Sequence, residues 1–151
     1  MPTDRSYVAS NDSSRARLRA LVGRLGDADL ARPMPAGWTV ASVLAHVAFW
    51  DQRILALIET SEKAGLAGVP RLGDVAEANW INDATKPLLL ALPPRKAADL
   101  TLAIAEATDA KLAALPDAFL GRNAEAGGPI NLQRAPHRLE HLDEIDAMLG
   151  R

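Results

Sequence analysis

Apolar residues recur at helical spacing in several stretches of the chain. In residues 18–25, leucine and valine fall at i, i+3, i+4 and i+7, a pattern that predicts one buried stripe on a helix. Residues 12–14 are of types that cap helix N-termini, and Gly26 is of the type that ends helices. We therefore expect a first helix here, preceded by a flexible N-terminal arm at residues 1–12.

Three more stretches have the pattern of long helices. The longest follows Thr39, a good N-cap residue, and runs to about Lys63 with a broad apolar face. A third helix is expected at residues 94–116, because proline suits a first helical turn. A fourth is expected at residues 136–149, where an apolar stripe ends at a glycine.

The segments between these helices are less regular. Residues 66–96 contain several prolines and are expected to hold one short helix, at residues 74–84. Residues 121–131 are rich in glycine and are expected to form a surface loop. Alanine and leucine dominate the chain, and no stretch has the alternation typical of a strand. The pattern predicts an all-α four-helix bundle, a single domain over residues 1–151 with a long crossover between its second and third helices.

Composition and charge exclude several classes of function. The chain has 151 residues and a net charge of -2, whereas nucleic-acid-binding domains are usually basic. No apolar run approaches the roughly 20 residues of a membrane span, and the polar N-terminus does not resemble a signal peptide. The absence of cysteine excludes disulfides, thiolate ligands and a cysteine nucleophile, so any thiol must come from outside. We expect a cytoplasmic protein without nucleic-acid or membrane partners.

The three histidines are the main candidates for chemistry. His137 and His141 are four residues apart and therefore adjacent on one helix face, and His46 lies within the longest predicted helix. If these helices pack together, three imidazoles can hold one metal ion and leave a coordination position open, as catalytic sites do. The alternative is a histidine pair that binds nothing. The segment lacks the zincin motif, since Glu140 directly precedes His141 instead of following His137.

Three stretches resemble the DinB-like superfamily: residues 37–51, 74–79 and 137–145. The resemblance implies an up-down-down-up four-helix bundle with a divalent metal ion held by His46, His137 and His141. The superfamily includes mycothiol-dependent maleylpyruvate isomerases, bacillithiol-type thiol transferases and metal-dependent hydrolases. Many relatives have an aromatic residue where this chain has Arg138, a change expected to leave the ligands intact and to alter the pocket wall or a helix-end contact.

Further residues are candidates for roles around such a metal ion. Glu144 lies three residues after His141, so it is the best-placed proton carrier; the alternative is a solvated surface glutamate. Trp50 lies one turn from His46, and Trp80 lies in the irregular segment; both are expected to wall a substrate pocket, with core packing as the alternative for Trp50. Imidazole ligands suit zinc or nickel, with iron or manganese as alternatives, and a low-molecular-weight thiol is a candidate cosubstrate.

Three hypotheses of function follow. The first is a metal-dependent enzyme of the thiol S-transferase/isomerase or hydrolase type that acts on a small molecule. The second is a non-catalytic bundle that binds a metal ion or a small ligand. The third is a structural or dimerisation module, since homodimers are the commonest assembly of soluble proteins.

Overall fold

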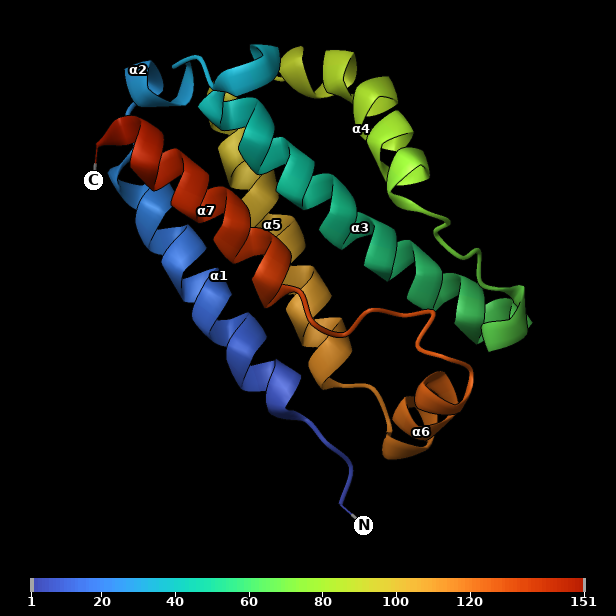
Figure 1. The fold of residues 1–151 in the computed structure, drawn as a ribbon. Coiled ribbons are helices and arrows are strands. Elements are labelled where there is room, and N and C mark those ends of the chain that lie inside the picture. Colours follow the sequence, from blue (N-terminus) through green and yellow to red (C-terminus); the bar gives the residue numbers. More distant parts are fainter. Residues whose placement is uncertain (1, 151) are drawn as a thin grey trace.

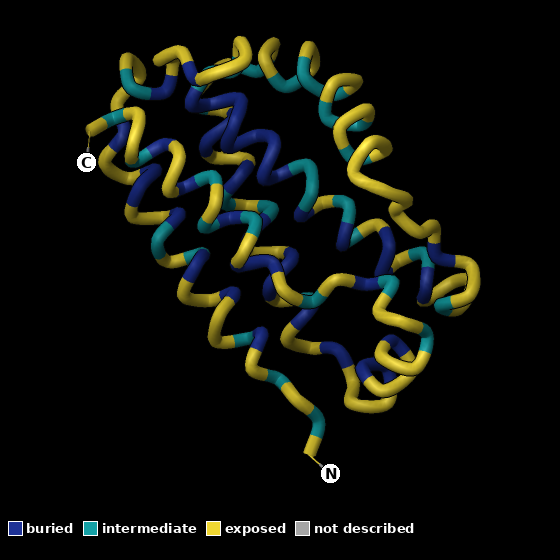
Figure 2. The backbone as a smooth tube through the Cα atoms, viewed as in Figure 1, coloured by how far each residue is buried: buried dark blue, intermediate teal, exposed yellow. Residues whose placement is uncertain are grey.

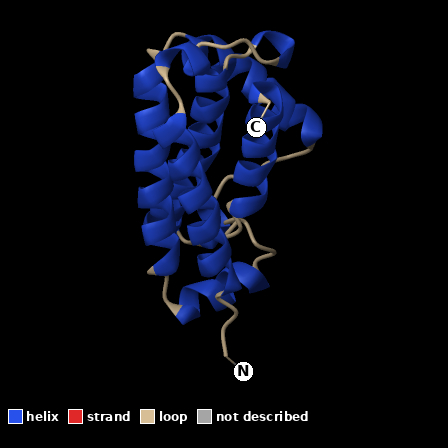
Figure 3. Cartoon of the chain, turned by 90° about the vertical axis from the view of Figure 1, so that its left-hand side faces the viewer, coloured by secondary structure: helices blue, strands red, loops and turns tan. Residues whose placement is uncertain are grey.

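The computed structural model describes residues 2–150, and within them the backbone is helical and has no β-strand (Figures 1 and 3). A single isolated bridge joins Pro33 to Thr39. The all-α prediction is confirmed. The described part of the chain forms these α-helices: α1 (Ser6–Arg24), α2 (Asp27–Leu30), α3 (Val40–Ala64), α4 (Val75–Leu90), α5 (Pro94–Ala113), α6 (Asp117–Glu125) and α7 (Ala135–Leu149).

Four of the five longest helices, α1, α3, α5 and α7, pack side by side (Figure 1). Helix α3 contacts α5 and α7, and α1 contacts the same two helices from the other side. In Figure 1, α1 and α7 run upward, toward the point marked C, while α3 and α5 run downward. The crossover between α3 and α5 contains α4, which lies along the outside of α3.

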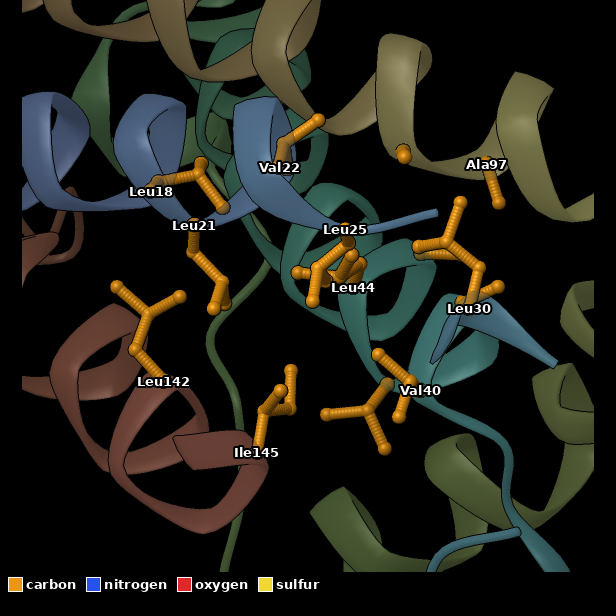
Figure 4. Close-up of a cluster of buried hydrophobic side chains, with 14 of the residues drawn as sticks. Leu18, Leu21, Val22, Leu25, Leu30, Val40, Leu44, Ala97, Leu142 and Ile145 are labelled. Atoms are coloured by element: carbon orange, nitrogen blue, oxygen red, sulfur yellow. The ribbon is translucent and has the colours of Figure 1, made fainter. Parts of the chain in front are cut away.

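Buried residues lie on the inward-facing sides of these helices (Figure 2). Their apolar side chains form two clusters. The larger cluster joins the predicted leucine and valine stripe of α1 to α3, α5 and α7, and Figure 4 shows Leu18 and Leu142 at the same end of it, with Leu21 between them. The second cluster lies toward the far end of α3 and includes Ile58, Leu112 and Phe119. Burial of these stripes is what holds the four long helices together.

The expected N-terminal arm at residues 1–12 is wrong for most of its length. Helix α1 begins at Ser6, about two turns earlier than predicted. Tyr7 is buried in the second cluster and donates a hydrogen bond from its hydroxyl to the carbonyl of Leu112, at 2.9 Å. Asn11 is also buried. The polar composition of this segment gave no indication of these helical turns, which contacts with distant residues hold in place. Met1 lies outside the described residues.

Two of the irregular segments are more helical than expected. Helix α4 continues through Pro87 to Leu90, beyond the predicted end at residue 84. The expected surface loop at residues 121–131 is partly wrong, because α6 extends to Glu125 and buries Phe119 and Leu120. The side chain of Asn123 then holds the following loop by hydrogen bonds to the backbone of Ile130, both at 3.0 Å.

Helix α3 is long and apolar enough to be compared with a membrane span. Two-thirds of its most apolar window (67%) is buried against the rest of the molecule, as in the core helix of a globular domain. Its N-terminus has the predicted cap: the Thr39 hydroxyl accepts a hydrogen bond from the amide of Ser42, and Ser42 Oγ accepts one from the amide of Thr39. This cap fixes the start of the helix that carries His46.

Candidate metal centre

Helices α3 and α7 bring the three histidines together. The Nε2 atom of His137 lies 3.2 Å from Nε2 of His46 and 3.1 Å from Nε2 of His141. His137 and His141 share one face of α7, as their spacing predicts, and α3 supplies His46 from across the interface. The three side chains form a group of potential ligand atoms that can hold a divalent metal ion.

Two of the three nitrogen–nitrogen separations have the length that such an ion requires, and the three ligand atoms all lie within 4.8 Å of one another. Zinc–imidazole bonds of about 2.1 Å place ligand nitrogens roughly 3.0 Å apart in octahedral and roughly 3.4 Å apart in tetrahedral geometry, and both observed separations lie between these values. Burial lowers the pKa of His46 from 6.5 to about 4, and that of His137 to about 3, with further lowering from the neighbouring imidazoles. Both rings are therefore neutral at physiological pH, which is the form that binds metal ions.

The outer nitrogens of the three rings have different surroundings. Nδ1 of His141 lies 2.9 Å from Oε2 of Glu144, so this carboxylate accepts the Nδ1 proton and leaves Nε2 free as a ligand. Nδ1 of His46 and Nδ1 of His137 are buried and have no hydrogen-bond partner among residues 2–150. Within this described part, Glu144 alone fixes a ring tautomer of the cluster.

A cavity of about 950 Å³ opens beside the histidines, large enough for a small-molecule substrate. His46 and His141 are part of its wall, which also has polar side chains of α4, apolar side chains around the start of α3, and both kinds from α7. The lining residues are Met34, Pro35, Trp38, Val43, His46, Asn79, Asn82, Asp83, His141, Glu144, Ala147 and Met148. The arrangement gives the histidine cluster access to a substrate-sized space.

The tryptophans differ from their predicted places. Trp80 is 69% exposed and is not part of the cavity wall, so the expectation that it lines the pocket is wrong. Trp50 does not line the cavity either. Its indole Nε1 donates a hydrogen bond to Oδ1 of Asn82, and Asn82 lines the cavity. Trp38 is the tryptophan in the wall, with its ring edge-on to His46 at a centroid separation of 5.7 Å. The helical period alone did not reveal this, because Trp38 precedes α3.

The sequence also did not reveal a buried ionic network next to the cluster. Arg138 is fully buried; its Nε donates to Asp51 Oδ2 at 2.9 Å, and its two terminal nitrogens donate to Asp109 at 2.8 and 2.9 Å. Arg134 donates from Nε to the other oxygen of Asp51, at 2.9 Å. Burial opposes the charge of Arg138, but Asp109 and Asp51 raise its pKa above the ordinary value. Arg138 thus lies in the core, neither in the pocket wall nor in a helix-end contact.

Comparison with known proteins agrees with this site. The family model of the mycothiol maleylpyruvate isomerase N-terminal domain matches residues 12–136, most of the chain. The chain belongs to this family. The family is a member of the DinB-like superfamily, so the resemblance drawn from the three sequence stretches is confirmed. The match includes His46 and ends one residue before His137. No curated protein and no solved structure matches the chain.

Proposed function

We propose that this protein is a divalent-metal-dependent enzyme that binds its metal ion through Nε2 of His46, His137 and His141. The observation that carries the proposal is the convergence of these three nitrogens beside a substrate-sized cavity that His46 and His141 line. Two of the rings face the cavity, so a coordination position on that side is available to a substrate or cosubstrate. Zinc or nickel fits three imidazole ligands.

The reaction class that we propose is thiol S-transfer or isomerisation, with hydrolysis as the alternative. A bound divalent ion lowers the pKa of a thiol or water ligand and polarises a carbonyl group. The chain has no cysteine, so the thiol would be a separate low-molecular-weight cosubstrate, and the name of the family refers to such a thiol. We further propose that α1, α3, α5 and α7 form the up-down-down-up bundle of the superfamily, and that the protein is cytoplasmic.

Glu144 has two roles in this proposal. Its carboxylate orients His141 by accepting the Nδ1 proton, and it also borders the cavity, with its side chain 48% exposed. From this place it can receive the proton released by a thiol or a water molecule as that ligand is deprotonated. The same carboxylate therefore serves ring orientation and proton transfer.

The side chains of the cavity wall suggest which substrate groups they can bind. The polar side chains that α4 and α7 contribute include two amides and the carboxylates of Asp83 and Glu144, and among residues 2–150 no lysine or arginine lines the cavity. These two carboxylates favour hydroxyl or amine groups of a substrate, whereas the bound divalent ion would attract an anionic group. The opposite wall, which includes Met34 and Trp38, is suited to an apolar portion of the substrate.

The proposal is tested by metal content and thiol-dependent turnover. Protein expressed without a histidine tag should carry about one equivalent of a divalent metal ion, and the double variant His137→Ala/His141→Ala should carry none. Trp80→Ala is the matched control, since Trp80 is exposed and outside the cavity wall. The metal-loaded protein is then assayed with small thiols and neutral electrophiles. Metal binding without turnover would favour the non-catalytic alternative, and failure to bind zinc, nickel or manganese would contradict both.

A further inference from the structure

We propose that Asp51 and Arg138 are positioning residues of the metal centre, whose buried ion pair fixes the axial register of α7 against α3. The inference rests on the proposed metal centre. In this view the pair keeps Nε2 of His46 and Nε2 of His137 at the separation that a shared metal ion needs. Asp51 and Arg138 would therefore act on the metal centre although neither side chain lines the cavity.

The pair joins the same two helices that carry the histidines. Arg138 directly follows His137 on α7, and Asp51 follows His46 by five residues on α3, about 7.5 Å along the helix axis. The ion pair and the His46–His137 contact are thus neighbouring contacts across the interface between α3 and α7. A displacement of α7 at one contact moves the other as well, because both lie on the same rigid helices.

The contacts of Arg138 leave little freedom for α7 to slide. Its guanidinium binds both oxygens of Asp109 on α5 and one oxygen of Asp51 on α3. The same guanidinium reaches Ser14 Oγ on α1, at 3.2 Å. Arg138 therefore contacts all three of the other long helices through directional hydrogen bonds. A slide of one residue, about 1.5 Å, would break several of these hydrogen bonds.

The charges in this network are balanced. Asp51 and Asp109 face Arg134 and Arg138, and all four residues are at most 5% exposed. Arg15 adds a further contact to Asp109 at 2.6 Å from the edge of the network. Because an unpaired buried charge is strongly unfavourable, the helices are held in the one arrangement that pairs all of them. Metal coordination needs similar accuracy, since bond lengths vary by only about 0.2 Å.

A network that only stabilised the fold would behave differently from one that sets the register. Buried ion networks can often be replaced as a whole by apolar residues without loss of stability. We therefore compare the wild type with the quadruple variant Asp51→Leu/Asp109→Leu/Arg134→Met/Arg138→Met, in which Arg15 keeps Asp12 as a partner at 3.0 Å. A second variant, Arg138→Lys, keeps the charge but loses the forked geometry. Leu112→Ala, in the second apolar cluster, is the control for general destabilisation.

The experiment is a titration of metal-free, full-length protein with Co²⁺, followed by its visible absorption, alongside circular dichroism and urea unfolding. If the network sets the register, Arg138→Lys and the folded quadruple variant bind Co²⁺ at least about tenfold more weakly and show altered d–d bands. Leu112→Ala unfolds at lower urea but keeps wild-type affinity and spectrum. If Arg138→Lys also keeps the wild-type Co²⁺ affinity and absorption spectrum, the inference is wrong, although the proposed metal centre is still supported. If the wild type binds no Co²⁺, the proposed function fails, and this inference fails with it.

Discussion

The indole Nε1 of Trp50 donates a hydrogen bond to Oδ1 of Asn82 at 2.9 Å, and this contact joins α3 to α4 over the cavity. Helix α4 has no buried residue, so polar contacts of this kind carry much of its attachment. A second one lies further along α4, where Lys86 donates to the carbonyl of Ala36 and its ammonium lies over the ring of Trp38. These two polar contacts therefore attach α4, and with it this part of the cavity wall, together with the packing of Leu89 against the apolar core.

Trp50→Phe should loosen this wall without unfolding the protein. The variant loses one hydrogen bond, worth about 1 kcal/mol, which corresponds to roughly fivefold faster opening of α4. Hydrogen–deuterium exchange should be faster in residues 79–86 and unchanged in α5. Trp80→Phe is the control, because Trp80 is exposed on the same helix. Equal exchange in both variants would show that the Trp50 contact does not hold α4.

Glu144→Ala should weaken metal binding by about 10- to 100-fold, because His141 loses the acceptor that orients its ring. Glu144→Gln keeps an acceptor without the charge, so its affinity should fall less while thiol-dependent turnover falls strongly. Zinc affinity is measured by competition with a chromogenic chelator. Glu140→Ala, an exposed glutamate on the same helix, should match the wild type. An unchanged affinity in Glu144→Ala would mean that its hydrogen bond does not position His141.

The metal-free protein should lose stability in mild acid. The pKa values of His46 and His137 are about 4 and about 3 in the folded state, below the ordinary 6.5. The unfolded chain therefore takes up these protons first, so this stability is complete above pH 6.5 and is lost as the pH falls toward 4. The slope from each ring is at most about 1.4 kcal/mol per pH unit. Urea midpoints measured from pH 7 to pH 4.5 should fall less steeply in His137→Asn; an identical slope would contradict the prediction.

Asn11→Ala should destabilise the fold by about 2–4 kcal/mol. The Asn11 carboxamide oxygen accepts hydrogen bonds from the amides of Arg134 and Ala135, at 2.9 and 3.2 Å, and so caps α7 from α1. Its removal leaves two buried amides without their acceptor. Urea unfolding measures the loss, and Asn131→Ala is the control, since its side chain contacts only an exposed neighbouring amide among the contacts described. A loss no larger than in the control would rule out this capping role.

The parts that the sequence could predict are those that depend on local periodicity. The leucine stripe of α1, the cap at Thr39 and the pairing of His137 with His141 on one face each follow from spacing within a single helix. Joining His46 to that pair required the resemblance, since spacing does not show which helices pack together. The same resemblance also identified the superfamily to which the chain belongs.

The parts that the sequence could not predict depend on contacts between distant residues. Arg138 looks like a surface residue by type, and its partners Asp51 and Asp109 lie 87 and 29 residues away. Tyr7 is buried by a contact with Leu112, 105 residues later, which no local pattern contains. Trp80 has the residue type of a pocket wall, yet α4 turns it to the outside. In each case the environment is set by packing between helices.

The separation of 91 residues between His46 and His137 also has a consequence for biosynthesis. While the ribosome is still adding residues before α7, the nascent polypeptide carries a single one of the three imidazoles and cannot chelate an ion with it. If the three imidazoles hold a metal ion, as we propose, its binding by all three must follow the emergence of α7, so a cell's supply of free metal acts on the folded helices and cannot guide their first steps.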